Sequence, residues 1–152
     1  MIIRKYETYQ NDGVLELVKE SEKRYEGTTN NPEEIKDMLN GAFRHGYRSE
    51  EIMHLVCFNT KMCCVGVFEI GHGTTTASLC NPKDIFKKAL MVNAEAIVIV
   101  HNHPSGSTEP SKDDVKLTKK VKLAGEFIGI ELLDHIIVAN DDYFSFMQND
   151  IL

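Results

Sequence analysis

Apolar residues recur at helical spacing in three segments of this chain, and each segment follows a helix-start signal. The signals are Asn31-Pro32, Asn81-Pro82 and Ser111, because asparagine and serine cap first turns and proline is favoured at the first helical position. Glycine commonly follows the last turn of a helix. The first helix is therefore predicted to end at Gly46 and the third at Gly125.

Shorter apolar runs rich in β-branched residues predict the strands. Residues 52–58 and 63–70 form two predicted strands around a polar turn, and the Gly-His-Gly sequence at 71–73 predicts a further turn. Residues 75–80 add a short predicted strand. The continuous β-branched run at 95–100 is typical of a central strand that is buried on both faces.

Two closing strands are predicted on either side of an Asn-Asp-Asp turn at 140–142, whereas residues 1–30 carry the weakest pattern. Within them, residues 14–21 fit either a short amphipathic strand or a helical turn. Helices otherwise alternate with strands along a chain whose length suits one domain. This order predicts an α/β (α+β) fold, in which helices flank a mixed central β-sheet.

Charge and composition narrow the classes of function. The net charge of −6 and the pI of about 5.5 disfavour broad binding to nucleic-acid phosphates, which needs a basic surface. The one basic stripe, Lys116, Lys119, Lys120 and Lys122, is interpreted as a solvated helix face. The first residues lack the apolar core of a signal peptide, and the longest apolar run is too short to span a bilayer. We therefore expect a cytoplasmic protein without a membrane partner.

The densest candidate chemistry lies at the end of the predicted central strand, in the sequence VHNHPSGSTEPSKDD. His101 and His103 are two residues apart, so on an extended segment their side chains share a face. Asp114 follows after a loop, and two imidazoles with one carboxylate match a catalytic zinc site that keeps one position open. The same residues fit a plainer role, since Ser111 and Asp114 also match a capping box at a helix start.

The combined pattern, H-x-H-P followed by S-x-x-D, resembles the JAMM signature of the JAB/MPN metalloprotease-like superfamily. Within that superfamily, VHNHPSG, PSKDD and ELLDHIIV resemble the RadC family of bacterial proteins. The resemblance implies a JAB/MPN-like (cytidine-deaminase-like) architecture and Zn²⁺ held by His101, His103 and Asp114. It also implies that Ser111 supports the attacking water or the transition-state oxyanion.

The resemblance also divides the chain. It covers residues 31–152, which we interpret as a RadC-like JAB/MPN domain, and it leaves residues 1–30 as an N-terminal extension or an extra strand. RadC proteins usually carry a further helix-hairpin-helix-like segment before this domain. The present chain is too short to hold that segment, so we expect a stand-alone JAB domain.

JAMM enzymes need a glutamate that is not a zinc ligand and that moves protons to and from the reacting groups. Spacing alone does not choose among Glu51, Glu69, Glu95 and Glu131. In the superfamily this glutamate comes where a helix leads into a strand, and RadC-like sequences carry one at the position of Glu51. We therefore predict Glu51 as the general base, with its neighbour Glu50 as the position for which it could be mistaken and Glu69 as the second candidate.

Two classes of function follow from the resemblance. The first is a zinc-dependent hydrolase of JAMM type, which cuts a peptide or isopeptide bond in a protein or peptide substrate. The alternative is a DNA-repair-associated accessory or DNA-binding protein without peptidase activity. Among the other histidines, His135 is interpreted as a hydrogen-bonded strand residue and His54 as structural. A substrate contact is a minor alternative for His72, and no substrate-binding residue is assigned from the sequence.

Overall fold

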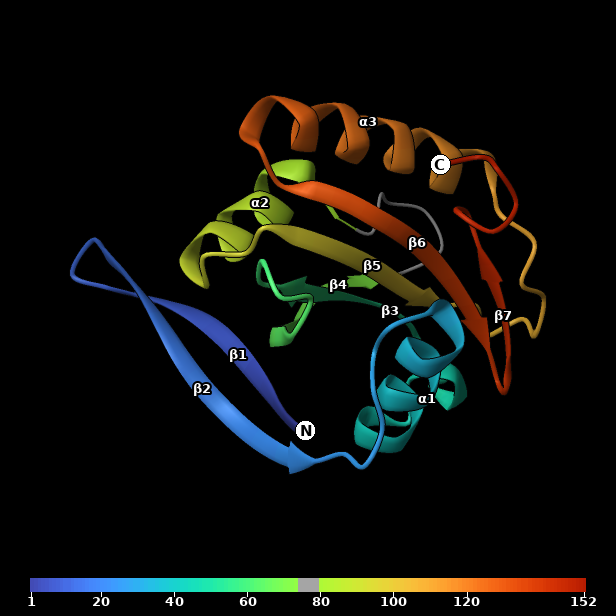
Figure 1. Ribbon diagram of the computed structural model, residues 1–152, viewed down its shortest axis with the longest axis horizontal. Helices are drawn as coiled ribbons and strands as arrows, with labels where there is room; N and C mark the ends of the chain where they lie inside the picture. Colours follow the sequence, from blue (N-terminus) through green and yellow to red (C-terminus); the bar gives the residue numbers. More distant parts are fainter. Residues whose placement is uncertain (74–79) are drawn as a thin grey trace.

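The computed structural model describes residues 1–73 and 80–152. These residues form one seven-stranded mixed sheet in the order β2-β1-β4-β3-β5-β6-β7, covered by helices (Figure 1). The strands are β1 (Ile2–Asn11), β2 (Val14–Arg24), β3 (Glu51–Phe58), β4 (Cys64–Gly73), β5 (Ala96–Asn102), β6 (Glu131–Ala139) and β7 (Asp142–Ser145). The α-helices are α1 (Pro32–Phe43), α2 (Pro82–Met91) and α3 (Lys112–Ile128). The predicted fold class is confirmed.

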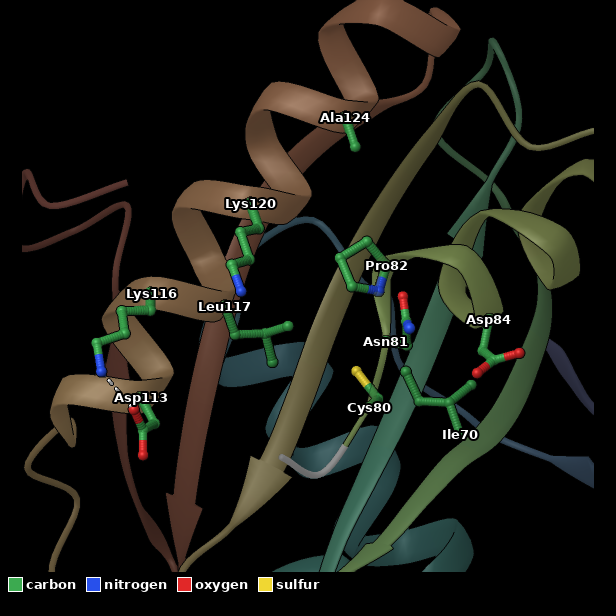
Figure 2. Close-up of a pocket in the computed structure, with 10 residues that line it drawn as sticks. All are labelled: Ile70, Cys80, Asn81, Pro82, Asp84, Asp113, Lys116, Leu117, Lys120 and Ala124. Atoms are coloured by element: carbon green, nitrogen blue, oxygen red, sulfur yellow. Dashed lines mark hydrogen bonds and ion pairs between the residues drawn. The ribbon is translucent and has the colours of Figure 1, made fainter. Parts of the chain in front are cut away.

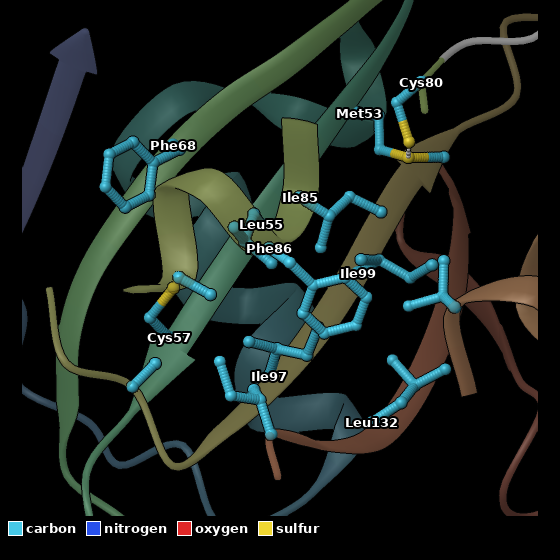
Figure 3. Close-up of a cluster of buried hydrophobic side chains, with 14 of the residues drawn as sticks. Met53, Leu55, Cys57, Phe68, Cys80, Ile85, Phe86, Ile97, Ile99 and Leu132 are labelled. Atoms are coloured by element: carbon cyan, nitrogen blue, oxygen red, sulfur yellow. Dashed lines mark hydrogen bonds between the residues drawn. The ribbon is translucent and has the colours of Figure 1, made fainter. Parts of the chain in front are cut away.

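The two faces of the sheet carry separate hydrophobic cores, because side chains alternate along each strand. On one face, α2 and α3 pack over Leu55, Ile97 and Ile99 (Figure 3). On the other face, α1 packs over Val56 and Val98. Helices on both faces leave β5 fully buried, as predicted for the central strand.

β5 lies between an antiparallel neighbour, β3, and a parallel neighbour, β6. The strand runs beyond the predicted end and includes His101 and Asn102. Because side chains alternate, His101 lies on the face covered by α2 and α3, and Asn102 lies on the face covered by α1. This register places one candidate ligand within the sheet itself.

Both glycines that were predicted to end helices have another role. The first helix ends at Phe43, and Arg44 adopts the left-handed conformation there, with φ of 54°. Gly46 lies in the following 3-10 turn, where a Cβ atom would come within 2.4 Å of the Asn140 carbonyl oxygen. Gly125 lies inside α3, where a Cβ atom would come within 2.4 Å of another backbone oxygen. Close backbone approach, rather than a helix end, accounts for these two glycines.

The turn predicted at residues 71–73 is wrong. β4 continues through Gly73, because Glu51, Ile52 and Met53 of β3 pair with these residues and extend the ladder. The strand predicted at 75–80 falls almost entirely outside the described residues.

The N-terminal residues form a hairpin, so residues 14–21 belong to a strand. β1 and β2 are joined by a two-residue turn, Asp12-Gly13, in which both residues have positive φ, as in the turns favoured by hairpins. β1 joins the remaining sheet in parallel with β4, where Lys5 pairs with Val67 and Tyr6 with Phe68. β2 forms one edge of the sheet, with most of its side chains exposed. Among the described residues, no helix is long and apolar enough to cross a membrane.

Candidate metal centre

Three elements bring the candidate residues to the same end of the central strand. β5 carries His101, and His103 follows one residue after the strand ends. Glu51 begins β3, two residues before Met53, which pairs with His101. Asp114 lies in the first turn of α3, as the sequence predicted. Residues that are far apart in the chain therefore meet through strand pairing and one loop reversal.

The side-chain atoms converge at short distances. Nε2 of His101 and Nε2 of His103 are 3.0 Å apart. The Asp114 carboxylate lies 3.3 Å from His101 Nε2 through Oδ1 and 3.8 Å from His103 Nε2 through Oδ2. Glu51 Oε1 lies 3.9 Å from His101 Nε2, and the ligand atoms of Glu51, His101 and His103 all lie within 4.8 Å of one another. Such a cluster can hold a metal ion.

The hydrogen bonds of His103 settle its tautomer. Its Nδ1 lies 2.8 Å from the carbonyl oxygen of Ser107. A carbonyl oxygen only accepts hydrogen bonds, so Nδ1 carries the hydrogen. In the neutral ring Nε2 then carries no hydrogen, and its lone pair faces His101.

A longer chain of hydrogen bonds settles the tautomer of His101. The Thr118 hydroxyl donates to the Asp114 carbonyl oxygen at 2.7 Å, so Thr118 Oγ1 accepts from Nδ1 of His135 at 2.6 Å. Nε2 of neutral His135 can then only accept, and it receives the hydrogen of His101 Nδ1 at 2.8 Å. All three side chains are buried, and burial lowers the pKa of both histidines, so the neutral forms are favoured. Nε2 of His101 therefore carries a lone pair and no hydrogen as well.

Two lone pairs that face each other at 3.0 Å repel unless a cation lies between them. Zinc–nitrogen bonds of ~2.0–2.1 Å around a tetrahedral centre place neighbouring ligand atoms roughly 3.3 Å apart. The distances of 3.0 and 3.3 Å around His101 Nε2 lie close to that value. The donor set of two imidazoles and a buried carboxylate therefore fits zinc in chemistry and in spacing.

Asp114 divides its two carboxylate oxygens between two tasks. Oδ2 accepts the backbone N–H of Ser111 at 2.7 Å, while Ser111 Oγ accepts the backbone N–H of Asp114 at 3.1 Å, which completes a capping box. Oδ1 faces His101. The cap and the candidate ligand are thus compatible, and the cap fixes the carboxylate in position. The Ser111 hydroxyl hydrogen is not used by the cap, since Oγ is an acceptor there.

Glu51 differs from Asp114 in burial and electrostatics. The Glu51 side chain is 30 % exposed, whereas that of Asp114 is 8 % exposed. Partial burial raises the pKa of Glu51, the Asp114 carboxylate raises it further, and His103 opposes the change. A carboxylate with a raised pKa is suited to accept and return protons near neutral pH.

The other glutamate candidates lie elsewhere. Glu69, on β4, pairs with Lys5 at 3.4 Å and with Nδ1 of His72 at 2.7 Å. Glu131 pairs with Ala96 at the start of β5, the end opposite the histidines. Glu95 directly precedes that strand start. Of the glutamates considered, Glu51 is the one that the structure places beside His101 and His103.

Asn102, between the two histidines, was not identified as a functional residue from the sequence. Its Oδ1 accepts the backbone N–H of Ile52 at 2.8 Å, and its Nδ2 donates to the carbonyl oxygens of Arg48 and Glu50 at 3.2 and 3.0 Å. These backbone groups flank Glu51 on both sides. Asn102 thus ties the Glu51 backbone to the strand that carries the histidines. Its partners lie about fifty residues earlier, so no local pattern reveals this role.

A cleft lies between α2, α3 and β4 (Figure 2), and none of the candidate metal ligands lines it. It has a volume of about 1010 Å³, and Asp113, the neighbour of Asp114, is part of its wall. Lys116 and Lys120 also line it, and Lys116 pairs with Asp113 at 2.9 Å. Lys122 instead donates to the carbonyl oxygen of Leu152. Lys116, Lys119 and Lys120 are exposed, as predicted for a solvated helix face, and Lys122 is half-buried.

Fold and site together define a JAB-like class of domain: a mixed sheet with a histidine pair at the end of its central strand and carboxylates from a neighbouring strand and helix. A family model described as RadC-like JAB domain matches residues 29–151. The chain belongs to this RadC family.

Curated relatives agree with that assignment. The chain is 42% identical over 102 residues to a UPF0758 protein of Thermotoga maritima, a match that covers 67% of this chain and 46% of the relative. It is 39% identical over 122 residues to a UPF0758 protein of Clostridioides difficile, covering 80% of this chain and 51% of the relative. A UPF0758 protein of Symbiobacterium thermophilum is 38% identical over 122 residues, with the same two coverages. The chain thus spans about half the length of these relatives.

Proposed function

We propose that the protein is a zinc-dependent hydrolase of JAMM type that acts on a peptide or isopeptide bond in the cytoplasm. One observation carries the proposal: two imidazole lone pairs, fixed by hydrogen bonds on their other nitrogens, face each other and a buried carboxylate oxygen. Glu51 stands beside this group without being part of its shortest contacts.

In this proposal His101, His103 and Asp114 hold the metal. Bound zinc supplies Lewis acidity, which polarises a substrate carbonyl and lowers the pKa of water toward ~7. Asp114, rather than Glu51, is the third ligand because it is closer to His101, more buried and fixed by the capping box. Glu51 keeps enough exposure to reach water and substrate.

Glu51 carries the proton through the reaction. It accepts a proton from the attacking water as the oxygen bonds to the carbonyl carbon, and it donates that proton to the amine as the C–N bond breaks. The Ser111 hydroxyl donates a hydrogen bond to the oxyanion that develops on the carbonyl oxygen. The cleft beside Asp113 offers room for an extended substrate.

Metal binding is tested with a matched pair of variants, Asp114→Asn and Asp113→Asn. Asp113 is the exposed neighbour that pairs with Lys116. We expect wild type and Asp113→Asn to bind about one zinc per chain, and Asp114→Asn and His103→Ala to bind zinc at least tenfold more weakly. Competition with a chromogenic chelator measures the affinity. The proposed centre is excluded if wild type binds no zinc, or if both aspartate variants bind it equally.

Catalysis is tested with Glu51→Gln against Glu50→Gln, on a panel of fluorogenic peptides and isopeptide-linked dimers. We expect Glu51→Gln to keep zinc and to lose turnover by a factor of roughly 10² to 10⁴, and Glu50→Gln to stay active. Zinc-loaded protein that cleaves nothing in the panel, or a Glu51→Gln variant with full turnover, would contradict the proposed hydrolase.

A further inference from the structure

A second pocket, with a volume of about 330 Å³, lies where the N-terminal hairpin meets the end of α1. We call it the cationic pocket, because four of its lining residues are Lys5, Lys23, Arg44 and Arg48. One carboxylate, that of Glu69, also lines it. We propose that the cationic pocket binds the phosphate group of a small phosphorylated molecule.

The charge of the pocket is opposite in sign to the net charge of the whole chain. The chain carries a net charge of −6, yet this pocket gathers four cations and one carboxylate. That carboxylate is already shared between Lys5 and His72. Within the described part of the chain, Arg44 and Arg48 form no ion pair. The two arginines are thus cations of the pocket that no carboxylate of this part of the chain compensates, and such positive charge attracts and holds an anion.

The lysines are held in place by other contacts. Lys5 also lies 3.8 Å from carboxylate oxygens of Glu7 and Glu20. Lys23 donates to the Ala42 carbonyl oxygen and lies over the Phe43 ring. These contacts position the lysine side chains at the pocket wall. The two arginines remain available for paired hydrogen bonds, the geometry in which guanidinium groups bind phosphate oxygens.

His54 adds a donor of different origin. The residue lines the pocket and is 3 % exposed, and its Nδ1 lies 3.0 Å from Nδ1 of His45. Nε2 of His45 is buried without a partner among the described residues. A buried N–H without an acceptor is rarer than an unpaired acceptor, so Nε2 of His45 carries no hydrogen. Nδ1 of His45 then carries the hydrogen and donates it to Nδ1 of His54.

His54 then carries its own hydrogen on Nε2, because its Nδ1 accepts from His45. Nε2 is the ring nitrogen that does not contact His45, and in this proposal it donates to the bound phosphate. Burial lowers the pKa of His54, and the positive charges of Lys5 and Arg48 lower it further, so the ring stays neutral. The pocket therefore combines four cations with one neutral N–H donor.

Size and shape favour a small molecule over a nucleic acid. A volume of about 330 Å³ is at the lower end of ligand pockets and admits a phosphate with a modest organic group. The site is concave, and the net charge of −6 disfavours the broad basic surface that a nucleic-acid backbone requires. The pocket lies on the β4–β1 side of Ile52 and His54, apart from the histidine pair of the metal centre.

Thermal unfolding and isothermal calorimetry test the proposal with inorganic phosphate and adenosine 5′-monophosphate, at constant ionic strength set by chloride. We expect both probes to raise the unfolding temperature of wild type with increasing concentration. The Arg48→Gln and Lys23→Gln variants should bind at least tenfold more weakly, and Arg24→Gln should match wild type. Zinc-free and zinc-loaded protein should respond alike, which separates this site from the metal centre.

Three results would overturn the proposal. The first is the absence of any stabilisation by either probe, and the second is equal binding by wild type and Arg48→Gln. The third comes from a short single-stranded DNA arm: if the oligonucleotide binds more tightly than the mononucleotide and depends on Arg48, the surface serves nucleic acid instead. The unfolding temperature of each variant without ligand shows that a lost response does not reflect lost folding.

Discussion

His101, Asn102 and His103 are consecutive, yet they act on different parts of the molecule. The histidines direct their lone pairs to one point, whereas Asn102 binds the backbone around Glu51. The shared face of the two histidines could be predicted from alternation along a strand. The partners of Asn102 could not, because strand pairing with a distant segment creates them.

At the same scale, the hydrogen-bond chain through Thr118 and His135 predicts an effect on metal affinity without contact to the metal. Thr118→Val removes the hydroxyl that accepts from His135 Nδ1. The His135 tautomer that makes its Nε2 an acceptor for His101 Nδ1 is then no longer fixed. We expect zinc affinity to fall by roughly tenfold or more, as for other residues that orient metal ligands. Chelator competition measures it.

Thr108→Val, a loop substitution outside the hydrogen-bond chain, provides the control for that measurement. Equal affinities for both variants would show that the tautomer of His101 does not depend on Thr118.

At the scale of elements, Asn102 connects β5 to the segment that leads into β3. Asn102→Asp keeps the shape of the side chain but loses the two donated hydrogen bonds and places a charge beside the carbonyl oxygens of Arg48 and Glu50. We expect faster hydrogen exchange of amides 48–52 and a loss of about 2 kcal/mol in the free energy of unfolding. Zinc affinity should change by less than in His103→Ala. Unchanged exchange in this segment would contradict the positioning role.

The elements also show where sequence patterns fail. The three helix starts were predictable because Asn31, Asn81 and Ser111 make local capping bonds. Gly46 and Gly125 were misinterpreted as helix ends. Glycine is needed at these positions because a backbone oxygen from elsewhere in the chain or from beyond the helix lies too close for a Cβ atom. The N-terminal hairpin went unrecognised although Asp12-Gly13 is a strong turn signal. Its flanking residues are mostly exposed and lack clear apolar alternation.

At the scale of the whole molecule, buried histidines make stability depend on pH. Burial lowers the pKa of His45 to about 3 and that of His54 well below its usual value of 6.5. Below about pH 6.5, the usual pKa of a histidine, the unfolded chain therefore binds more protons than the folded chain, and the free energy of unfolding falls as pH falls. Each such histidine contributes a slope of up to about 1.4 kcal/mol per pH unit.

Urea unfolding of chelated protein measures this dependence between about pH 7 and pH 5, the window in which an unfolded histidine becomes charged. We expect the free energy of unfolding to decrease as the pH is lowered. The His54→Gln variant should show a slope that is smaller by the contribution of one histidine, up to about 1.4 kcal/mol per pH unit. A stability that stays level through this range would show that these rings are protonated in the folded protein.

The N-terminal hairpin meets the rest of the sheet through a short parallel junction between β1 and β4. Such junctions open in local fluctuations that cost less than global unfolding, so amides of β2 should exchange with solvent well before those of β5. Lys5 and Lys23 of the cationic pocket belong to this hairpin, whereas Arg44 and Arg48 lie between α1 and β3. A bound phosphate therefore fastens the two parts together and slows β2 exchange in proportion to its saturation. Deuterium uptake at an edge strand thus becomes a gauge of ligand occupancy.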